Sequence, residues 1–486
     1  MASKIRWQKI GTPQRVGTGR WYSVLNHSRV NRASNQFIYS NKPQVRFATT
    51  GGKDVSASKL PPHALLPNLM LWRSLLIATV STHRFLLGPA LSVLSFFSKP
   101  RRGFLSLQDN LLLRKIFKGT LYNHFCAGEN SQEVKATINN IKHMGFRGVI
   151  LTYAAEVVVD KTSEEDTANG LVEPKDGSTP GTLREHLQDQ GIEEWRKGVL
   201  KTVGMVGEGD YLALKFTGAG PAVSGALEAQ KPIPKQMIEA LKDVCNEALK
   251  REARILVDAE QHFLQTGIDL IAMELMQKYN RNGQAIVFNT YQAYLKRTPQ
   301  VLQKHLQEAR KGDFVLGVKL VRGAYINSEP RHLINDTKAE TDISYDSIAH
   351  KLLHGQYPLE EQVDQPLPRL ELFLATHNRA SVLKAYELQQ SHKEEGLPLI
   401  KVQYGQLLGM ADGVSCALLQ LKQEAINKDN TISPEAYKCL SWGTLEECSS
   451  YLLRRAVENR DAVTRTEEEY YALKKEAARR LLGNSS

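Results

Sequence analysis

The first fifty residues contain no Asp and no Glu, although they contain nine Lys and Arg residues. A cationic, acid-free segment that is rich in Arg and Ser and has no apolar run is typical of a mitochondrial or chloroplast transit peptide and excludes a secretory signal. The alternative is a basic disordered arm that binds RNA or lipid. We predict that residues 1–50 are a mitochondrial transit peptide, cleaved near residues 47–50.

The rest of the chain has almost no net charge. Removing those nine residues from the 63 Lys and Arg of the chain leaves 54 basic against 52 acidic residues, which is +2. The overall +11 is therefore a property of the N-terminus, and the body gives no reason to expect a nucleic-acid partner.

Cysteine is sparse, with five scattered residues and no CxxC or Cys/His cluster. This excludes a disulfide framework, predicts no metal site and fits a reducing compartment such as the mitochondrial matrix. No GxGxxG follows an early strand, which weakens a Rossmann interpretation.

Long apolar runs are also missing. Residues 63–98 are strongly apolar, but their longest uncharged stretch, residues 85–98, has fourteen residues. A transmembrane helix needs about 20. Helices that pack on a domain, or that lie on a membrane surface, fit this region.

What the chain does contain is an alternation of helical patterns with short β-branched runs. Eight parallel strands buried on both faces predict an α/β fold of the (β/α)8 TIM-like barrel type, preceded by an N-terminal helical region. An open doubly wound sheet is the alternative. The expected strands are residues 148–153, 211–216, 254–259, 285–290, 314–321, 370–376, 398–404 and 436–442.

The expected domain organisation follows from this pattern. Residues 51–131 form a linker and helical region, residues 132–465 form the barrel, and residues 466–486 form a C-terminal helix. Thr466 and Glu469 predict a capping box for that helix, with Gly483 as its C-terminal cap. Two insertions interrupt the barrel, an acidic surface loop at 157–191 and residues 326–368, which include a helical pattern near 342–353.

Polar residues gather where these strands end, which is where barrel enzymes place their chemistry. Strands this apolar do not need such groups for packing, because an unpaired buried charge costs several kcal/mol. The polar residues concerned are Lys215, Thr217, Asp258, Glu260, Asn289, Thr290, Gln292, Lys319, Arg322, Tyr325, Thr376, His377, Asn378 and Gln406.

The helix after the last strand has an unusual face. Tyr451, Arg454, Arg455 and Glu458 fall at i, i+3, i+4 and i+7 and therefore lie together. One interpretation is a solvated face with an Arg454–Glu458 pair. The other is a clamp of two guanidinium groups for a carboxylate, which arginine binds through a planar fork.

Four segments resemble the proline dehydrogenase family: GVKLVRGAY (317–325), LATHN (374–378), QLLGM (406–410) and YLLRRAVEN (451–459). FCAGE (125–129), VDAEQ (257–261) and FNTYQ (288–292) are similar to its eukaryotic mitochondrial branch. The resemblance implies FAD-dependent oxidation of L-proline to 1-pyrroline-5-carboxylate. It also implies electron transfer to ubiquinone, peripheral association with the inner membrane, and a place on its matrix face.

The resemblance also implies roles for individual residues. Arg454 and Arg455 grip the proline carboxylate, and Glu458 orients one of them. Lys215 and Asp258 line the same pocket, whose apolar wall comes from Tyr325, Leu407 and Tyr451. The residues expected to hold FAD are Asn289, Gln292, Lys319, Val321, Arg322, Gly323, Thr376, His377 and Asn378.

Two positions depart from the family pattern. Cys439 stands where proline enzymes commonly carry a Tyr that crowds position 4 of the substrate ring, and Thr152 precedes Tyr153 where an Asp-Tyr pair is frequent. The small Cys439 predicts tolerance of 4-hydroxyproline, so a hydroxyproline dehydrogenase of the same family is one alternative.

Two further alternatives come from other classes of protein. A lysine-dependent aldolase would use Lys215 or Lys319 as its Schiff-base residue. A basic barrel that binds RNA or a membrane is the other, and it would not be an enzyme.

Overall fold

The computed structural model describes residues 60–97, 110–154, 189–357, 367–426, 428–461 and 463–483. Eight parallel strands close into a barrel in chain order, each paired with its sequence neighbour and β8 with β1. The predicted barrel is confirmed, and the open doubly wound sheet is excluded. The strands are β1 (Gly148–Tyr153), β2 (Tyr211–Leu214), β3 (Arg254–Val257), β4 (Val287–Gln292), β5 (Leu316–Val321), β6 (Leu370–Ala375), β7 (Lys401–Leu407) and β8 (Glu435–Trp442).

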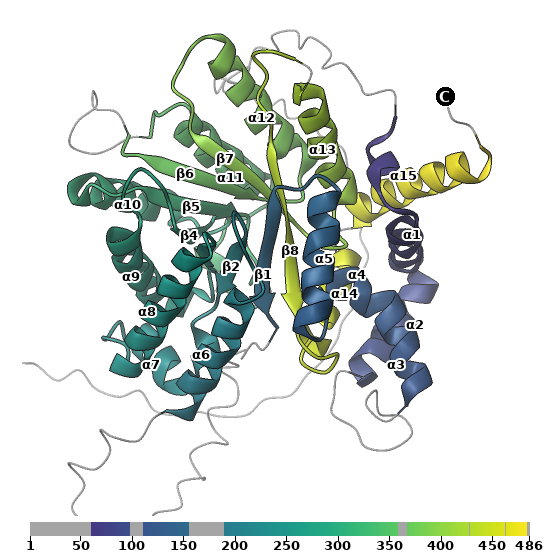
Figure 1. Cartoon of the computed structure of the whole chain (residues 1–486), viewed down its shortest axis with the longest axis horizontal. Coiled ribbons are helices and arrows are strands. Elements are labelled where there is room, and N and C mark those ends of the chain that lie inside the picture. The colour runs from purple at the N-terminus through teal and green to yellow at the C-terminus, as the bar shows by residue number, and fades with distance from the viewer. Residues whose placement is uncertain are drawn as a thin grey trace, which may run out of the picture. The chain divides into compact units, whose positions relative to one another are not determined.

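Helices cover the outside of the barrel (Figure 1). They form because each has one apolar stripe. In α8, Met237, Leu241, Val244 and Ala248 recur at helical spacing and are all buried. The helices beside the strands are α5 (Ser131–His143), α6 (Gln190–Val203), α7 (Pro221–Glu228), α8 (Lys235–Lys250), α9 (His262–Tyr279), α10 (Thr298–Gly312), α11 (Lys338–Leu353), α12 (Arg379–Glu394) and α13 (Asp412–Ile426).

Side chains along each strand alternate between the barrel interior and the helical layer. The aromatic rings of Tyr211, Phe288, Phe373 and Tyr437 lie in the interior, and their centroids are 5.3–5.6 Å apart. They come from the first half of β2, β4 and β8 and from the middle of β6, so they fill the barrel below its C-terminal end. The interior at the C-terminal end is left to polar residues.

A second helical layer flanks the barrel. It comprises α1 (Asn68–Thr82), α2 (Arg84–Phe97), α3 (Leu111–Phe117), η2 (Lys118–Tyr122) and α4 (Asn123–Phe125) from the N-terminal region, with α14 (Ser449–Asp461) and α15 (Val463–Leu481) from the C-terminal one. Figure 1 shows α1 beside α15, with α2 and α3 below it. The helices predicted within residues 63–98 are confirmed.

No single helix among the described residues has the length and apolarity needed to cross a bilayer. The pair formed by residues 68–82 and 85–96 passes that test together, with a bend of 104° between its halves.

The C-terminal helix differs from the prediction. It begins at Val463 rather than at Thr466, so Thr466 and Glu469 do not form a capping box. Tertiary contacts take the carboxylate instead: Glu469 Oε1 lies 2.8 Å from His63 Nε2 and accepts a hydrogen bond from Gly413 N. Gly483 does adopt the left-handed conformation expected of a C-terminal cap, with φ +68°.

A capping box is present elsewhere, at the start of α11. Thr337 accepts from the backbone N–H of Glu340, whose carboxylate accepts from Thr337 N. The helix predicted in the second insertion therefore begins earlier, at Lys338. Strands β4 and β7 lie two to three residues later than expected. The predicted transit peptide and residues 157–188 of the acidic loop lie outside the described residues.

Candidate active site

Residues from four strands meet inside the C-terminal end of the barrel. Lys319 Nζ on β5 donates to Asp258 Oδ1, just after β3, at 2.5 Å. Cys439 on β8 lies close enough to Lys319, Asp258 and Lys215 for their charges to act on its thiol, whose pKa burial raises to about 11. The structure thus brings together Lys215, Asp258, Lys319 and Cys439.

Helix α14 adds its arginines from the mouth of the barrel. Arg455 also acts electrostatically on the Cys439 thiol, and its guanidinium carbon lies 5.1 Å from the centre of the Tyr451 ring. Arg455 Nη2 donates to Glu458, so Glu458 is in a position to orient this arginine. Arg455 Nε is buried and has no hydrogen-bond partner among the described residues.

An unpaired guanidinium N–H in a cationic pocket is a binding feature for an anion. Leaving such a donor buried is costly unless a ligand completes it. Because the fork of Arg455 is already half used by Glu458, its orientation is fixed before a ligand binds. A carboxylate is the small anion whose geometry fits the remaining donors.

The apolar side of this pocket comes from Leu407 and Tyr451. Leu407 is the neighbour of Cys439 in the β7–β8 register. It packs with Tyr451 and Met410 in one apolar cluster. A small apolar ring would therefore meet Leu407 and Tyr451 while its charged end meets Arg455.

A second group of predicted residues lies along the ends of β5, β6 and β7. Arg322 donates to Thr376 Oγ1 at 2.7 Å, and its Nε lies 2.6 Å from an Asp342 oxygen. Asn378 caps α12 by accepting from Ser381 N. His377 Nε2 accepts from Leu407 N at 3.2 Å, which links this group to the apolar wall.

The loop after β5 approaches its neighbours closely. Gly323 has φ +151°, and a Cβ there would lie 2.4 Å from the Tyr294 ring. Gln292 holds the same loop, because its Oε1 accepts from Ala324 N while its Nε2 donates to Glu260 O. Val321 is the register partner of Gln292. Tyr325 follows in this loop, beside Tyr294.

Asn289 is the predicted residue that the structure does not bring to this site. Its neighbours Val287 and Tyr291 belong to the layer between strands and helices, and Asn289 Nδ2 donates to Asp269 on α9 at 2.8 Å. The side chain therefore lies behind the sheet. Period-2 alternation explains this, since the inward positions of β4 are Phe288, Thr290 and Gln292.

Glu260 is among the polar residues that follow the third strand, but the sequence pattern assigned it no role. Its buried carboxylate accepts from Phe216 N and from both N and Oγ1 of Thr217. Burial raises the pKa of Glu260, while the hydrogen bond from Thr217 and the charge of Lys215 oppose that shift. Glu260 therefore positions the turn that follows Lys215.

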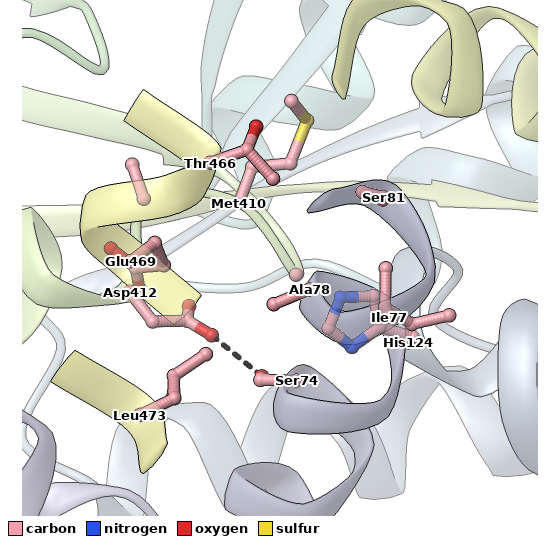
Figure 2. A pocket seen from close by; sticks show the side chains of 12 residues that line it. Ser74, Ile77, Ala78, Ser81, His124, Met410, Asp412, Thr466, Glu469 and Leu473 are labelled. Carbon is pink, nitrogen blue, oxygen red and sulfur yellow. Dashed lines mark hydrogen bonds between the residues drawn. The ribbon is translucent and has the colours of Figure 1, made fainter. Parts of the chain in front are cut away.

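A separate buried polar cluster lies outside the barrel, under α1. Lys438 Nζ pairs with Asp412 Oδ1 at 2.8 Å, and Ser74 Oγ donates to Asp412 Oδ2. His124 lies beside them, around a cavity of about 50 Å³ (Figure 2). This volume suits water rather than a ring-shaped ligand. Among the described residues, no group of three or more His, Cys, Asp and Glu is arranged to hold a metal ion.

The same mouth fits an extended anionic cofactor beside the carboxylate pocket. Lys319, which is paired with Asp258, and Arg322, which is paired with Asp342, bring cations to this mouth. The N-terminus of the sixteen-residue helix α12 lies beside Thr376. Gln292, Lys319, Arg322, Gly323, Thr376, His377 and Asn378 lie along the ends of β4 to β7 and would be the residues to hold a flavin dinucleotide there. Asn289 does not face that space.

The fold and these side chains together define a (β/α)8 barrel whose charged and polar residues gather at the C-terminal mouth. The sequence profile of the family described as proline dehydrogenase matches residues 134–468, and the chain belongs to that family. The family is flavin-dependent, and its members oxidise proline or hydroxyproline. This excludes the lysine-dependent aldolase and the basic binding barrel.

Similar curated proteins come from both branches of substrate use. A probable mitochondrial proline dehydrogenase of Schizosaccharomyces pombe is 29% identical over 413 residues, covering 76% of this chain and 82% of that protein. The hydroxyproline dehydrogenase of Bos taurus is 29% identical over 395 residues, with the same two coverages. The mitochondrial proline dehydrogenase 1 of Drosophila melanogaster is 35% identical over 259 residues, which cover 51% of this chain and 36% of that protein.

The fold is similar to that of a solved structure of proline utilization A from Bdellovibrio bacteriovorus. The TM-score is 0.57 at 16% identity, covering 83% of this chain. The chain spans about two fifths of that longer protein, of which 39% is covered.

Proposed function

We propose that this enzyme uses FAD to oxidise L-proline to 1-pyrroline-5-carboxylate and passes the electrons to ubiquinone at the matrix face of the mitochondrial inner membrane. The observation that carries the proposal is the buried, unpartnered Nε of Arg455 beside Lys215, Lys319 and Cys439. The mitochondrial names of the relatives in Schizosaccharomyces pombe and Drosophila melanogaster support the location.

The chain's own residues bind and orient the substrate. Arg455, held by Glu458, takes the proline carboxylate together with Arg454, and the pyrrolidine ring then lies against Leu407 and Tyr451. Two donors on one carboxylate fix the ring in one orientation, which is what a hydride transfer from a defined carbon requires.

The positive charge of the pocket also favours the reactive form of the substrate. Proline loses a hydride from C5 and a proton from nitrogen, forming the C=N bond, so its amine must first be neutral. The cations Arg455, Lys215 and Lys319 outnumber the carboxylates Asp258 and Glu458 beside them, so the net charge disfavours the ammonium form of the bound amine. The flavin, when bound, supplies the acceptor for the hydride.

Hydroxyproline is the second candidate substrate, on the evidence of Cys439. Its side chain is partly exposed inside the mouth, next to Leu407 in register. Cysteine leaves room there that a tyrosine would fill. The similar identity to a hydroxyproline dehydrogenase and to a proline dehydrogenase agrees with either substrate.

The purified protein tests the proposal directly. We expect a yellow protein whose absorbance at about 450 nm bleaches on addition of proline without oxygen and returns with a soluble ubiquinone analogue. If the flavin absorbance bleaches with 4-hydroxyproline but not with proline, the substrate is hydroxyproline and the proposal of proline is wrong. If the absorbance bleaches with proline but does not return with the quinone analogue, ubiquinone is not the electron acceptor.

A further inference from the structure

One buried carboxylate joins three of the loops at the mouth of the barrel. Glu329 lies in the loop after β5 that also contains Arg322 and Tyr325, and 0% of its side chain is exposed. Its Oε1 accepts a hydrogen bond from the backbone N–H of His262 at 2.9 Å, and its Oε2 lies against His262 Nδ1. Tyr294 OH, in the loop after β4, donates to the same Oε1 at 3.5 Å. Glu329 therefore connects the loops after β3, β4 and β5.

Glu329 also caps helix α9, which begins at His262. The N-cap residue of this helix, Gln261, makes no hydrogen bond from its side chain to the first turn. The N–H of His262 would otherwise be one of the unpaired donors at a helix N-terminus. A carboxylate is stabilised there by the hydrogen bond and by the helix dipole. Because this carboxylate is 67 positions away along the chain, the cap fixes the loop after β5 to α9.

The loop that Glu329 holds has little apolar burial of its own. Residues 323, 324 and 326–328 are exposed, and Ile326 is 63% exposed. Within the loop, the N–H groups of Ser328 and Glu329 both donate to Tyr325 O at 3.0 Å. These bonds close the turn on itself but do not attach it to the barrel. The buried carboxylate therefore does much of what apolar packing does in other loops.

Tyr294 connects Glu329 to the other end of the loop, where the expected cofactor residues lie. Its backbone N–H donates to Arg322 O at 2.7 Å, and a Cβ on Gly323 would lie 2.4 Å from its ring. Its hydroxyl bonds to Glu329. Since one side chain contacts both ends of the loop, a displacement at Glu329 changes the position of the backbone at Arg322 and Gly323.

We propose that Glu329, together with His262, is a positioning residue for the flavin cofactor. It holds the loop after β5 in the conformation in which Arg322 and Gly323 bind the dinucleotide. Glu329 acts through the loop and does not itself contact the cofactor or the substrate. This inference rests on the proposed function, since it takes FAD as the ligand of the loop, and it adds a residue that none of the sequence motifs marked.

Retention of the cofactor tests the proposal without an activity assay. The full chain loaded with FAD is diluted through a concentration series, and the released FAD is measured by its fluorescence. Glu329→Ala should raise the Kd for FAD by about tenfold or more, because the loop loses a charge-assisted hydrogen bond and the cofactor must then order it. Glu329→Gln keeps an acceptor for the His262 N–H and should raise the Kd by only about threefold.

A matched control separates positioning from general destabilisation. Asp210 is a carboxylate with 1% of its side chain exposed, at the opposite end of the barrel, where it accepts from Val149 N and Gly207 N. Asp210→Asn should lower the free energy of unfolding but leave the Kd for FAD within about twofold of the native value. Equal increases in the Kd for Asp210→Asn and Glu329→Ala would show that Glu329 has no positioning role.

His262 gives a second variant at the same contact. Its side chain is 28% exposed, so His262→Ala is compatible with folding and keeps the backbone N–H that binds Glu329. This variant should raise the Kd for FAD by about threefold, and combining it with Glu329→Ala should add nothing, because both act on one contact. Native affinity in both His262→Ala and Glu329→Gln would overturn the proposal even if Glu329→Ala does not fold.

The same titration distinguishes failure of this inference from failure of the proposed function. A native chain that binds no FAD would overturn both. A native chain that binds FAD, with Glu329→Ala folded and equal to it in affinity, would overturn the positioning role alone and leave the proposed function unchanged.

Discussion

At the scale of single residues, the proposed chemistry depends on a side chain whose hydrogen-bond donors are not all used within the protein. Arg455 has one donor group engaged by Glu458 and a buried Nε with no partner. Lys319, in contrast, is already paired with Asp258. A ligand carboxylate therefore gains its strongest new hydrogen bond at Arg455. Lys319 contributes positive charge to the pocket while it stays paired with Asp258.

Replacing Arg455 tests the clamp. Arg455→Met should raise the KM for proline by about a hundredfold, because charge-assisted hydrogen bonds of about 1.5–3 kcal/mol are lost. Arg455→Lys keeps the charge but loses the fork, and should raise it by about tenfold. Steady-state kinetics measure both. Arg196→Lys, at an exposed ion pair, is the control. A KM within threefold of the native value in Arg455→Met would contradict the assignment.

Cys439 tests substrate selection. Cys439→Tyr should lower kcat/KM for 4-hydroxyproline by about tenfold or more and change the value for proline by less than about threefold, because the added ring occupies space beside position 4. Cys439→Ser, of similar size, should leave both substrates nearly unchanged. No turnover of hydroxyproline by the native enzyme, with no difference in Cys439→Tyr, would show that Cys439 does not set specificity.

At the scale of elements, the loops after the strands are fixed by hydrogen bonds from buried polar side chains. Glu260 holds the turn after β2, and Gln292 joins the loops after β3 and β5. The pair Lys438–Asp412 fixes the start of α13 to β8, with each side chain 3% exposed. These residues make the strand ends rigid, so that the pocket exists before a substrate enters.

Removing one partner of the buried Lys438–Asp412 pair should destabilise the protein more than replacing both partners with apolar residues. Asp412→Asn leaves the Lys438 charge buried without its partner and should lower the free energy of unfolding by about 3–5 kcal/mol. The double substitution Asp412→Leu with Lys438→Met should recover most of that loss, since it removes both charges. Urea unfolding measures the difference. A loss below about 1 kcal/mol in Asp412→Asn would mean that water already solvates Lys438.

At the scale of the whole molecule, stability should fall in acid. Burial lowers the pKa of His124 and of His305 to about 4, from an unfolded value of 6.5. The unfolded chain therefore binds protons that the native chain does not between these values. The stabilisation is complete above pH 6.5 and is lost as the pH falls toward 4, on the order of 3 kcal/mol for each histidine.

Asp412 extends this loss to lower pH. Burial alone would raise the pKa of its carboxyl, but the charge and hydrogen bond of Lys438 lower it to about 2. Its stabilising contribution is present above pH 3.8 and disappears toward pH 2. Burial raises the pKa of Asp269 to about 6, which opposes the loss between pH 6 and 4, so the two histidines must outweigh it. Urea unfolding at pH 7, 5 and 4 should show a net decline. A constant free energy of unfolding over this range would contradict neutral burial of the two histidines.

The positive charge of residues 1–50 predicts that the protein is imported into mitochondria. A fluorescent reporter fused to residues 1–50 should enter mitochondria, because an acid-free cationic segment is the signal that import recognises. Replacing Arg15, Arg20 and Arg29 with Glu should leave the reporter in the cytosol. A reporter fused to residues 51–486 is the control and should not be imported. Mitochondrial import of that control would place the signal elsewhere.

The fold and the family of this enzyme could be predicted from its sequence, because the patterns that indicate them are formed by residues close together along the chain. Periodicity along the chain predicts strands and helices, and it identified the barrel. The RR pair on α14 and the polar ends of the strands mark the mouth, because parallel strands bring their C-terminal ends to one side. The face of the sheet on which each side chain lies was harder to predict from the sequence. Asn289 looks like its neighbours in sequence, and a shift of one residue along a strand reverses the face on which it lies.

Sequence alone therefore determined the fold class, the family and the composition of the pocket, since these follow from residue types and their spacing. Tertiary structure decided what each polar group binds. It paired Glu458 with Arg455, engaged Glu469 with His63 and so removed the predicted helix cap. It also packed helices α1 and α2 of the N-terminal region against α14. Such partners lie far apart along the chain, and only packing of the whole molecule selects among them.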